Sequence, residues 1–258
     1  MKAQTILVIP DTQVRQGVDT SHILAAGKLL VDIKPDVVLF LGDWWDMPSL
    51  SSYDKGTIAS EGRRVKADIQ AGQDAMDLFF KPLRKLQQEQ RAQKKKAYNP
   101  RKVFCMGNHD ERLDRIPKTS PELEGVFGTH LLGLDKWGVE VYDYLTPVEV
   151  AGITFIHYTP NPFSGKPYGG SAMNILKNVG KSFVQGHKQS LDIAIRPVYG
   201  NQMQLGVVCG AFYSHDEVYK GKTGNHHWRG LLVLNNAKDG FADPQFISIE
   251  QLKERYKA

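Results

Sequence analysis

Residues 36–43 read Asp-Val-Val-Leu-Phe-Leu-Gly-Asp, and this stretch decides the fold class. Its apolar run, Val37 to Leu41, predicts a strand that is buried on both faces. A similar strand is predicted at Thr5–Ile9, and residues 19–33 between the two are predicted to form a helix. Strand, helix and strand in this order indicate a parallel pair joined by a right-handed crossover.

The rest of the chain extends this pattern and then changes character. A long helix is predicted from Val65, because apolar residues recur there at spacings of three and four, and Pro82 is expected to kink or split it. A third strand is predicted at 101–106, and a helix at 171–179. Further short strands are predicted at Val148–Val150, Ile153–Tyr158, Ser182–Gln185, Leu191–Ile195, Gln204–Cys209, Leu231–Leu234 and Gln245–Ile249. We expect one α/β domain spanning residues 1–258, with two packed sheets.

Composition excludes several classes of protein. The chain has 258 residues, 41% hydrophobic and 24% charged, which is ordinary for a globular protein and unlike disordered or fibrous chains. Its longest apolar run is far shorter than the roughly 20 residues of a membrane span, and its start lacks the apolar core of a secretory signal. Cys105 and Cys209 cannot form a disulfide framework, which fits a reducing compartment. We therefore expect a cytoplasmic protein that does not associate with membranes.

The net charge of +5 is concentrated in one segment. Residues 81–102 contain nine Lys or Arg and a single acidic residue, Glu89, so the remainder of the chain is slightly acidic. Such a segment could contact nucleic-acid phosphates and release their counterions. A solvated helical face is the competing interpretation, and it is favoured on sequence grounds.

Polar residues that can bind metals follow several of the predicted strands. Asp11, Asp43 and Asn108 each come just after a strand of the parallel half, at the edge where open α/β sheets bind ligands. His157 ends a strand of the second half, and His187 follows another. Oxygen and nitrogen donors that meet from two sheets predict a dinuclear metal site.

Five short blocks carry a family resemblance. They are Asp11-Thr12-Gln13, Gly42-Asp43-Trp44-Trp45-Asp46, Gly107-Asn108-His109-Asp110, His157 and Gly186-His187-Lys188-Gln189. Their order resembles the calcineurin-like metallophosphoesterases and, more loosely, the versions that bacteriophages often carry. The Gly-Asn-His-Asp block alone should occur by chance at on the order of 10⁻³ in a chain of this length. The resemblance spans residues 5–235 and implies a four-layer α/β/β/α sandwich with two central mixed β-sheets and metals at one edge.

The resemblance also implies a set of metal ligands, with two departures. The family has histidine at positions 13 and 189, where this chain has glutamine. The first ion would then have only oxygen ligands, from Asp11, Gln13, Asp43 and Gln189. The second ion would have Asp43, Asn108, His157 and His187. We expect a weak first site for Mn²⁺ or Mg²⁺ beside a tighter second site for Mn²⁺, Zn²⁺ or Fe²⁺.

The catalytic roles follow from the same resemblance. Two ions, bridged by Asp43, would share a hydroxide that attacks a phosphate ester, and their excess positive charge would attract the anionic substrate. His109 would protonate or hydrogen-bond the leaving oxygen rather than bind a metal. Asp110 is expected to orient the His109 ring and raise its basicity. Asp46 is expected to contact the metal ligands rather than the ions themselves.

Several aromatic and histidine side chains are candidates for substrate contacts. Trp44 and Trp45 could stack on a base beside the metals, although packing under the site is the favoured interpretation. His226 and His227 are expected to contact the substrate phosphate from a loop above the metals. In an alternative, one of them or His215 replaces the missing nitrogen ligand.

These features favour a phosphodiesterase, with a phosphoester substrate that could be a nucleic acid or a nucleotide. The basic segment, the paired tryptophans and Asp110 in place of the glutamate typical of serine/threonine protein phosphatases all point this way. A phosphomonoesterase on the same metal centre is an alternative, because fold does not select a substrate. A non-catalytic metal- or nucleotide-binding protein is another, since Gln13 and Gln189 could mark a degenerate site. The sequence does not indicate an oligomeric state.

Overall fold

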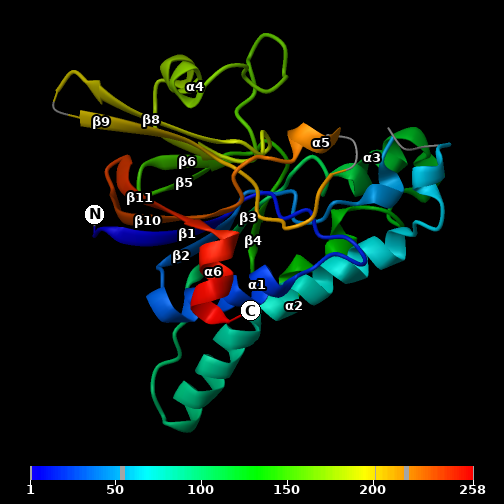
Figure 1. Cartoon of the computed structure of the whole chain (residues 1–258), viewed down its shortest axis with the longest axis horizontal. Helices are drawn as coiled ribbons and strands as arrows, with labels where there is room; N and C mark the ends of the chain where they lie inside the picture. The colour runs from blue at the N-terminus through cyan, green and yellow to red at the C-terminus, as the bar shows by residue number, and fades with distance from the viewer. Residues whose placement is uncertain (1, 53–55, 201, 218–220, 258) are drawn as a thin grey trace.

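The computed structural model describes residues 2–52, 56–200, 202–217 and 221–257. Two β-sheets lie face to face with helices on their outer faces, which gives four layers (Figure 1). The first sheet has the order β11-β10-β1-β2-β3-β4, formed by β1 (Gln4–Ile9), β2 (Val37–Phe40), β3 (Arg101–Cys105), β4 (Glu140–Tyr142), β10 (Gly230–Lys238) and β11 (Phe241–Ser248). The second has the order β5-β6-β7-β9-β8, formed by β5 (Val148–Val150), β6 (Ile153–Ile156), β7 (Phe183–Gln185), β8 (Leu191–Val198) and β9 (Gln202–Cys209). Both sheets mix parallel and antiparallel pairs, as the predicted α/β/β/α sandwich requires.

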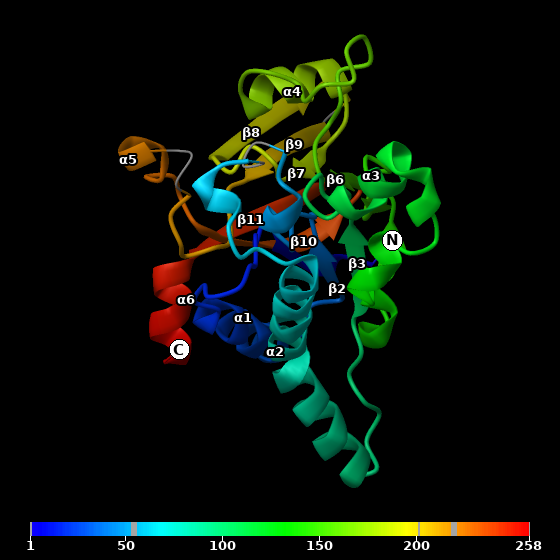
Figure 2. The same ribbon diagram turned by 90° about the vertical axis from the view of Figure 1, so that its right-hand side faces the viewer.

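Helices cover both outer faces of the paired sheets (Figures 1 and 2). The first sheet is covered by α1 (Ser21–Ile33), α2 (Val65–Ala92) and α6 (Ile249–Tyr256), and the second by α4 (Ala172–Val179). The shorter helices are α3 (Arg112–Thr119), α5 (Gly221–Gly224) and the 3₁₀ helices η1 (Pro48–Leu50), η2 (Ile58–Ser60), η3 (Pro121–Leu123), η4 (Thr129–Leu132) and η5 (Leu134–Trp137). None of the helices in the described ranges combines the length and the apolar composition that a bilayer crossing requires.

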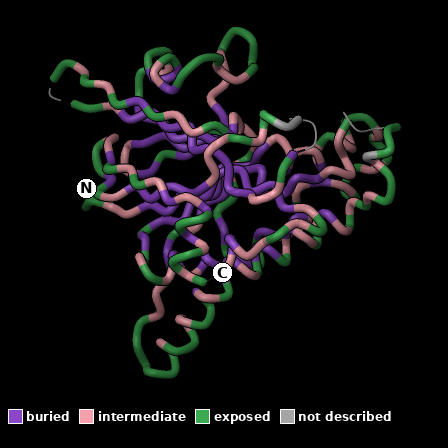
Figure 3. Tube along the Cα trace, viewed as in Figure 1, coloured by how far each residue is buried: buried purple, intermediate pink, exposed green. Residues whose placement is uncertain are grey.

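Three apolar clusters fill the spaces between the four layers. Figure 3 shows that the buried residues are concentrated along the strands of the two sheets. In β1, Ile6 and Val8 face the second sheet, whereas Leu7 and Ile9 face the helices. This alternation buries both faces of the strand, which explains why its sequence is apolar throughout. The third cluster packs α4 on the second sheet. Each fully buried aliphatic side chain contributes about 1.5–3 kcal/mol of transfer free energy to this packing.

The connection from β1 through α1 to β2 confirms the predicted parallel pair, with Ile6 opposite Val37. Strand β3 continues the parallel series, so β1, β2 and β3 all end at one edge of the sheet. In the second sheet, β6 and β7 are also parallel. The loops that follow these five strands carry the metal-binding candidates.

The expectation that Pro82 could split the long helix is wrong, because α2 continues through it to Ala92. Helix α1 packs against this segment, where Gly27 lets its backbone approach Phe79 and Pro82 closely. This packing stabilises a helix that proline alone would weaken. The sequence also failed to predict β4 and α6, the latter capped by the side chain of Ser248.

Candidate metal centre

Donor atoms from both sheets converge where β2, β6 and β7 end. One ligand atom each from Asp43, His157 and His187 lie within 4.8 Å of one another. The side-chain oxygen of Asn108 lies 2.9 Å from His157 Nε2 and 2.8 Å from His187 Nδ1. The expected ligands of the second ion are therefore brought together.

The protonation of these groups fits a cation. His157 Nδ1 lies 2.8 Å from the carbonyl oxygen of Leu41, and Nε2 faces Asn108 Oδ1 at 2.9 Å. Burial and the charge of His157 lower the pKa of His187 to about 4, so its ring is neutral at pH 7. Although burial opposes ionisation of Asp43, the charges of His157 and His109 hold the pKa of its carboxyl below the usual value. A carboxylate, an amide oxygen and two imidazoles are residue types that bind divalent metals.

The residues expected around the first ion are buried and only partly satisfied. Asp11 Oδ1 accepts the backbone N–H of His187 at 2.9 Å, whereas among the described residues Asp11 Oδ2 has no hydrogen-bond partner. The same is true of both amide atoms of Gln13, a residue with no exposed surface. A buried polar atom left without a partner costs about 1–3 kcal/mol. These orphaned oxygens fit a bound cation.

Asp11 and Gln189 differ from the close group in their contacts. Asp11 is not among the residues within 4.8 Å of one another, and burial together with the charge of Asp43 raises its pKa to about 6. The amide oxygen of Gln189 accepts a hydrogen bond from the Tyr213 hydroxyl at 2.9 Å. The oxygen-only side is thus less tightly assembled than the histidine-containing side.

Four of the candidate ligands have left-handed backbone conformations. Their φ angles are 44° for Gln13, 50° for Asp43, 67° for His187 and 58° for Gln189. Residues other than glycine rarely adopt this conformation, which costs about 1–3 kcal/mol and is concentrated at functional sites. The loops that carry the candidate ligands thus have strained backbones at these four positions.

Glycines let the backbone pack directly against the carboxylates. A Cβ atom at position 107 would collide with the side chain of Asp43, and one at position 186 would collide with the side chain of Asp11. The glycines of the Gly-Asn-His-Asp and Gly-His blocks are therefore required by these close approaches.

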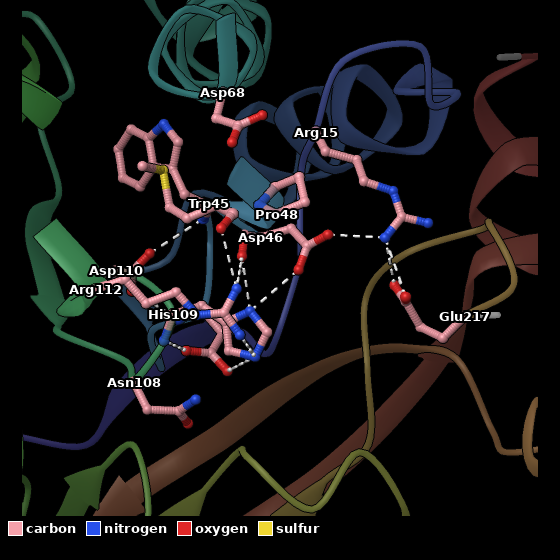
Figure 4. Close-up of polar contacts among 12 residues, drawn as sticks. Arg15, Trp45, Asp46, Pro48, Asp68, Asn108, His109, Asp110, Arg112 and Glu217 are labelled. Atoms are coloured by element: carbon pink, nitrogen blue, oxygen red, sulfur yellow. Dashed lines mark hydrogen bonds and ion pairs between the residues drawn. The ribbon is translucent and has the colours of Figure 1, made fainter. Parts of the chain in front are cut away.

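His109 lies beside the carboxylate of Asp43, and Asp46 orients the His109 ring (Figure 4). His109 Nδ1 lies 2.8 Å from the carbonyl oxygen of Asp46 and 3.1 Å from its Oδ1. Because both neighbours are acceptors, Nδ1 carries a proton. Nε2 lies 3.9 Å from Asp43 Oδ2 and 3.4 Å from Arg112 Nη2. The ring therefore directs Nε2 toward the candidate metal centre.

The expectation that Asp110 orients the His109 ring is wrong. The fully buried Asp110 carboxylate instead accepts backbone N–H groups from Asp43 at 2.7 Å, Gly107 at 2.9 Å and Trp45 at 3.1 Å. Burial and the charge of Asp43 raise its pKa to about 7. Asp110 fixes the loop that follows β2, and the contact with the His109 ring comes from Asp46.

The predicted stacking role of Trp44 also needs correction. Trp44 and Trp45 are 1% and 0% exposed, and their indole N–H groups donate to the carbonyl oxygens of Gly72 and Ile69 on α2. A base cannot reach either ring face. Both tryptophans fill the space beneath the site, as the favoured interpretation held.

The three other candidate histidines, His215, His226 and His227, lie on the segment that follows β9. His226 is exposed, and the ring of the half-buried His227 lies 5.6 Å from that of Tyr213, the residue that contacts Gln189. His215 Nε2 lies 2.8 Å from Glu217 Oε1 and is therefore engaged by a carboxylate. Contact of His226 or His227 with a phosphate stays a prediction.

Sequence reasoning missed three charged residues of the site. Arg15 lies 2.8 Å from Asp46 and 3.0 Å from Glu217, and Arg112 donates to the carbonyl oxygens of Asp46 and Met47 (Figure 4). The position of Arg112, three residues after His109, could have signalled a neighbour one helical turn away. Glu217 belongs to no recognisable block.

The basic segment lies far from this centre. Twenty residues separate Gly72, beneath the tryptophans, from Ala92, which is about 30 Å along a helix. The distal part of α2 extends beyond the sheets, and its outer turns are exposed (Figures 1 and 3). Arg91 and Lys94–Lys96 are exposed at its tip. A partner bound at this tip would have to reach the metal centre with a different part of its structure.

Comparisons with known proteins show distant relatives. No protein-family model matches the chain. It is 25% identical to the Gene 54 protein of Mycobacterium phage L5, over 96% of this chain and 94% of that protein. It is also 27% identical to the Gene 54 protein of Mycobacterium phage D29, over 72% and 69% of the two chains. Both relatives are phage proteins, as the looser resemblance suggested, and their names state no activity.

Solved structures give a weaker likeness. One is a conserved uncharacterized protein, a predicted phosphoesterase, from Streptococcus pneumoniae TIGR4. The two chains are 13% identical with a TM-score of 0.38, over 97% of this chain and 92% of the other. A similarity of this size carries no argument about function.

Proposed function

We propose that this chain is a metal-dependent phosphoester hydrolase that acts on phosphodiesters, with nucleic acids or nucleotides as the substrate class. The observation that carries the proposal is the convergence of Asp43, Asn108, His157 and His187, with His109 Nε2 directed at the same centre. The resemblance of the five sequence blocks to metallophosphoesterases supports it independently of this geometry.

Two sets of donors would hold two divalent ions. The histidine-containing set is Asp43, Asn108, His157 and His187, suited to Mn²⁺, Zn²⁺ or Fe²⁺. The oxygen set is Asp11, Gln13, Asp43 and Gln189, suited to Mn²⁺ or Mg²⁺. When bound, such ions supply positive charge that lowers the pKa of water and stabilises the charge on phosphate oxygens.

His109 is the candidate general acid. Although burial opposes its ionisation, the carboxylates of Asp43 and Asp46 raise its pKa to about 9, which favours the protonated ring. Asp46 retains the proton on Nδ1, which leaves the Nε2 proton for the leaving oxygen of the ester. Arg112, next to Nε2, would help to hold an anionic phosphate there.

Hydrolysis assays test this function. Bis(p-nitrophenyl) phosphate and p-nitrophenyl phosphate would be incubated with the protein and Mn²⁺, Mg²⁺ or Zn²⁺. We expect hydrolysis of the diester, a loss of about 10²–10⁴-fold for Asn108→Ala, and a smaller loss for His109→Ala, because p-nitrophenolate is a weak base that needs little protonation. Arg255→Gln, which breaks a half-exposed ion pair with Asp32 on the helical layer, serves as the control. Equal inactivity of wild type and both site variants on both esters would contradict the proposal.

Two other functions give different outcomes in the same assays. A phosphomonoesterase would prefer p-nitrophenyl phosphate over the diester. A non-catalytic protein is favoured by one observation, the two amides at Gln13 and Gln189, which are weaker metal donors than imidazoles. That protein would bind Mn²⁺ in calorimetry and hydrolyse neither ester.

A further inference from the structure

A row of alternating charges runs from the candidate general acid to the segment after β9 (Figure 4). His109 Nδ1 lies 3.1 Å from Asp46 Oδ1, and Asp46 Oδ2 lies 2.8 Å from Arg15 Nη1. The same Arg15 nitrogen lies 3.0 Å from Glu217 Oε2, and Glu217 Oε1 lies 2.8 Å from His215 Nε2. The row joins the loops that follow β1, β2, β3 and β9.

The burial of this row makes its pairing strongly constrained. The side chains of Asp46 and Glu217 are only 8% and 5% exposed, and that of Arg15 is 23% exposed. Buried carboxylates require a nearby positive charge, and here one guanidinium contacts both. Removing Arg15 would take the shared guanidinium away from both buried carboxylates. The two carboxylates therefore hold the Arg15 guanidinium in place, and the guanidinium in turn holds both carboxylates.

The geometry divides the two oxygens of Asp46 between two partners. Oδ2 is held by Arg15, which leaves Oδ1 to accept from His109 Nδ1. Rotation of the carboxylate would break both contacts at once. Because a guanidinium is planar and donates in fixed directions, Arg15 restricts this rotation more than a mobile ammonium group would.

We propose that Arg15 and Glu217 are positioning residues for the reaction, which act through Asp46 to hold the His109 ring with Nε2 directed at the leaving oxygen. This inference rests on the proposed function. It adds to that function a residue from the loop after β1 and one from the segment after β9, which lies 202 positions further along the chain. Arg15 and Glu217 need not touch the substrate themselves.

The kinetic test uses two diesters that differ in their need for a proton. The p-nitrophenolate released from bis(p-nitrophenyl) phosphate is a weak base and departs unprotonated, whereas the phenolate released from diphenyl phosphate is a stronger base. We expect Arg15→Gln and Glu217→Gln to lower kcat for diphenyl phosphate about tenfold more than for the nitrophenyl ester, with KM little changed. Equal losses on both esters would show a merely structural role and overturn the proposal.

A double variant guards against misfolding. Arg15→Met combined with Glu217→Gln removes the cation together with one of the two carboxylates, so no pair of like charges is left buried. The same selective loss on diphenyl phosphate is expected. The control Arg255→Gln breaks another arginine–aspartate pair on the helical layer and should lower neither rate.

A spectroscopic readout separates this proposal from the proposed function. In ¹H–¹⁵N spectra of the wild-type protein, the Nδ1 proton of His109 should be protected from exchange, and His109→Asn assigns its signal. We expect Arg15→Gln and Glu217→Gln to shift or abolish it, and Arg255→Gln to leave it in place. Inactivity of wild type on both esters would refute the hydrolase alone. A missing wild-type signal, or one that both site variants leave unchanged, would overturn the positioning role.

Discussion

The two sides of the candidate metal centre differ in how closely their donor atoms lie together. On the histidine-containing side, Asn108 Oδ1 already lies within 2.9 Å of two imidazole nitrogens, and Asp43 completes the group. On the oxygen-only side, Asp11 Oδ2 and the amide of Gln13 are buried without partners among the described residues. The donor atoms are therefore gathered on the histidine-containing side, whereas the oxygen-only side keeps unsatisfied polar atoms.

The largest expected effect separates the two sides directly. His157→Ala should weaken binding of the tighter ion more than about 100-fold, because even outer partners of metal ligands are worth 10- to 100-fold. Gln13→Ala should affect only the weaker ion. Calorimetric titration with Mn²⁺ measures the affinities of both sites. Loss of the same ion in both variants would contradict the assignment of His157 and Gln13 to different sites.

A smaller change should make the two sides alike. Gln13→His replaces an amide with an imidazole, a better ligand for Zn²⁺, and should tighten the weaker Zn²⁺ site about tenfold. Metal analysis after dialysis against Zn²⁺ gives the occupancy, with Arg255→Gln as the control. An unchanged weaker site in Gln13→His would show that position 13 is no ligand.

The ligands on the two sides are also expected to titrate differently. Burial and the charge of Asp43 raise the pKa of Asp11 to about 6, so this carboxyl gains a proton as pH falls through that value. Burial and the charge of His157 lower the pKa of His187 to about 4, so its nitrogen stays available at lower pH. A bound cation lowers both values, because each ligand binds in its deprotonated form.

As pH falls, the ion beside Asp11 should therefore leave first. The electron paramagnetic resonance of free Mn²⁺ should show two release steps in this order. A single step, or loss of the histidine-bound ion first, would contradict the assignment.

The smallest effect is expected at the far end of α2. Changing Lys94, Lys95 and Lys96 together to glutamine should weaken DNA binding and lower its logarithmic salt slope by about one for each lysine. Binding measured at several salt concentrations tests this prediction. An unchanged slope would show that these lysines do not contact DNA phosphates and would favour a solvated helical face.

The sequence predicted those parts of the fold that depend on local pattern. Strands β1 and β2 could be predicted because both of their faces are buried, which makes their sequences apolar throughout. The continuity of α2 through Pro82 could not, because it depends on packing against α1 at Gly27. The exposed three-residue strand β4 has too little pattern to be recognised.

The same division applies to the site. The blocks around Asp43 and Asn108 could be placed at the sheet edge because each directly follows a strand. The exchange of roles between Asp110 and Asp46 could not be predicted, since it depends on which way each loop turns its carboxylate. Glu217 comes from a segment 202 positions after Arg15, so no local spacing in the sequence predicts its contact with the site.

Anomalous scattering at the manganese edge, measured on crystals soaked in Mn²⁺, tests whether these residues, distant in sequence, gather around divalent cations. We expect a strong peak bounded by Asp43, Asn108, His157 and His187, with a weaker second peak beside Asp11 and Gln13. Crystals that bind Mn²⁺ only elsewhere, or show no peak between these side chains, would contradict it.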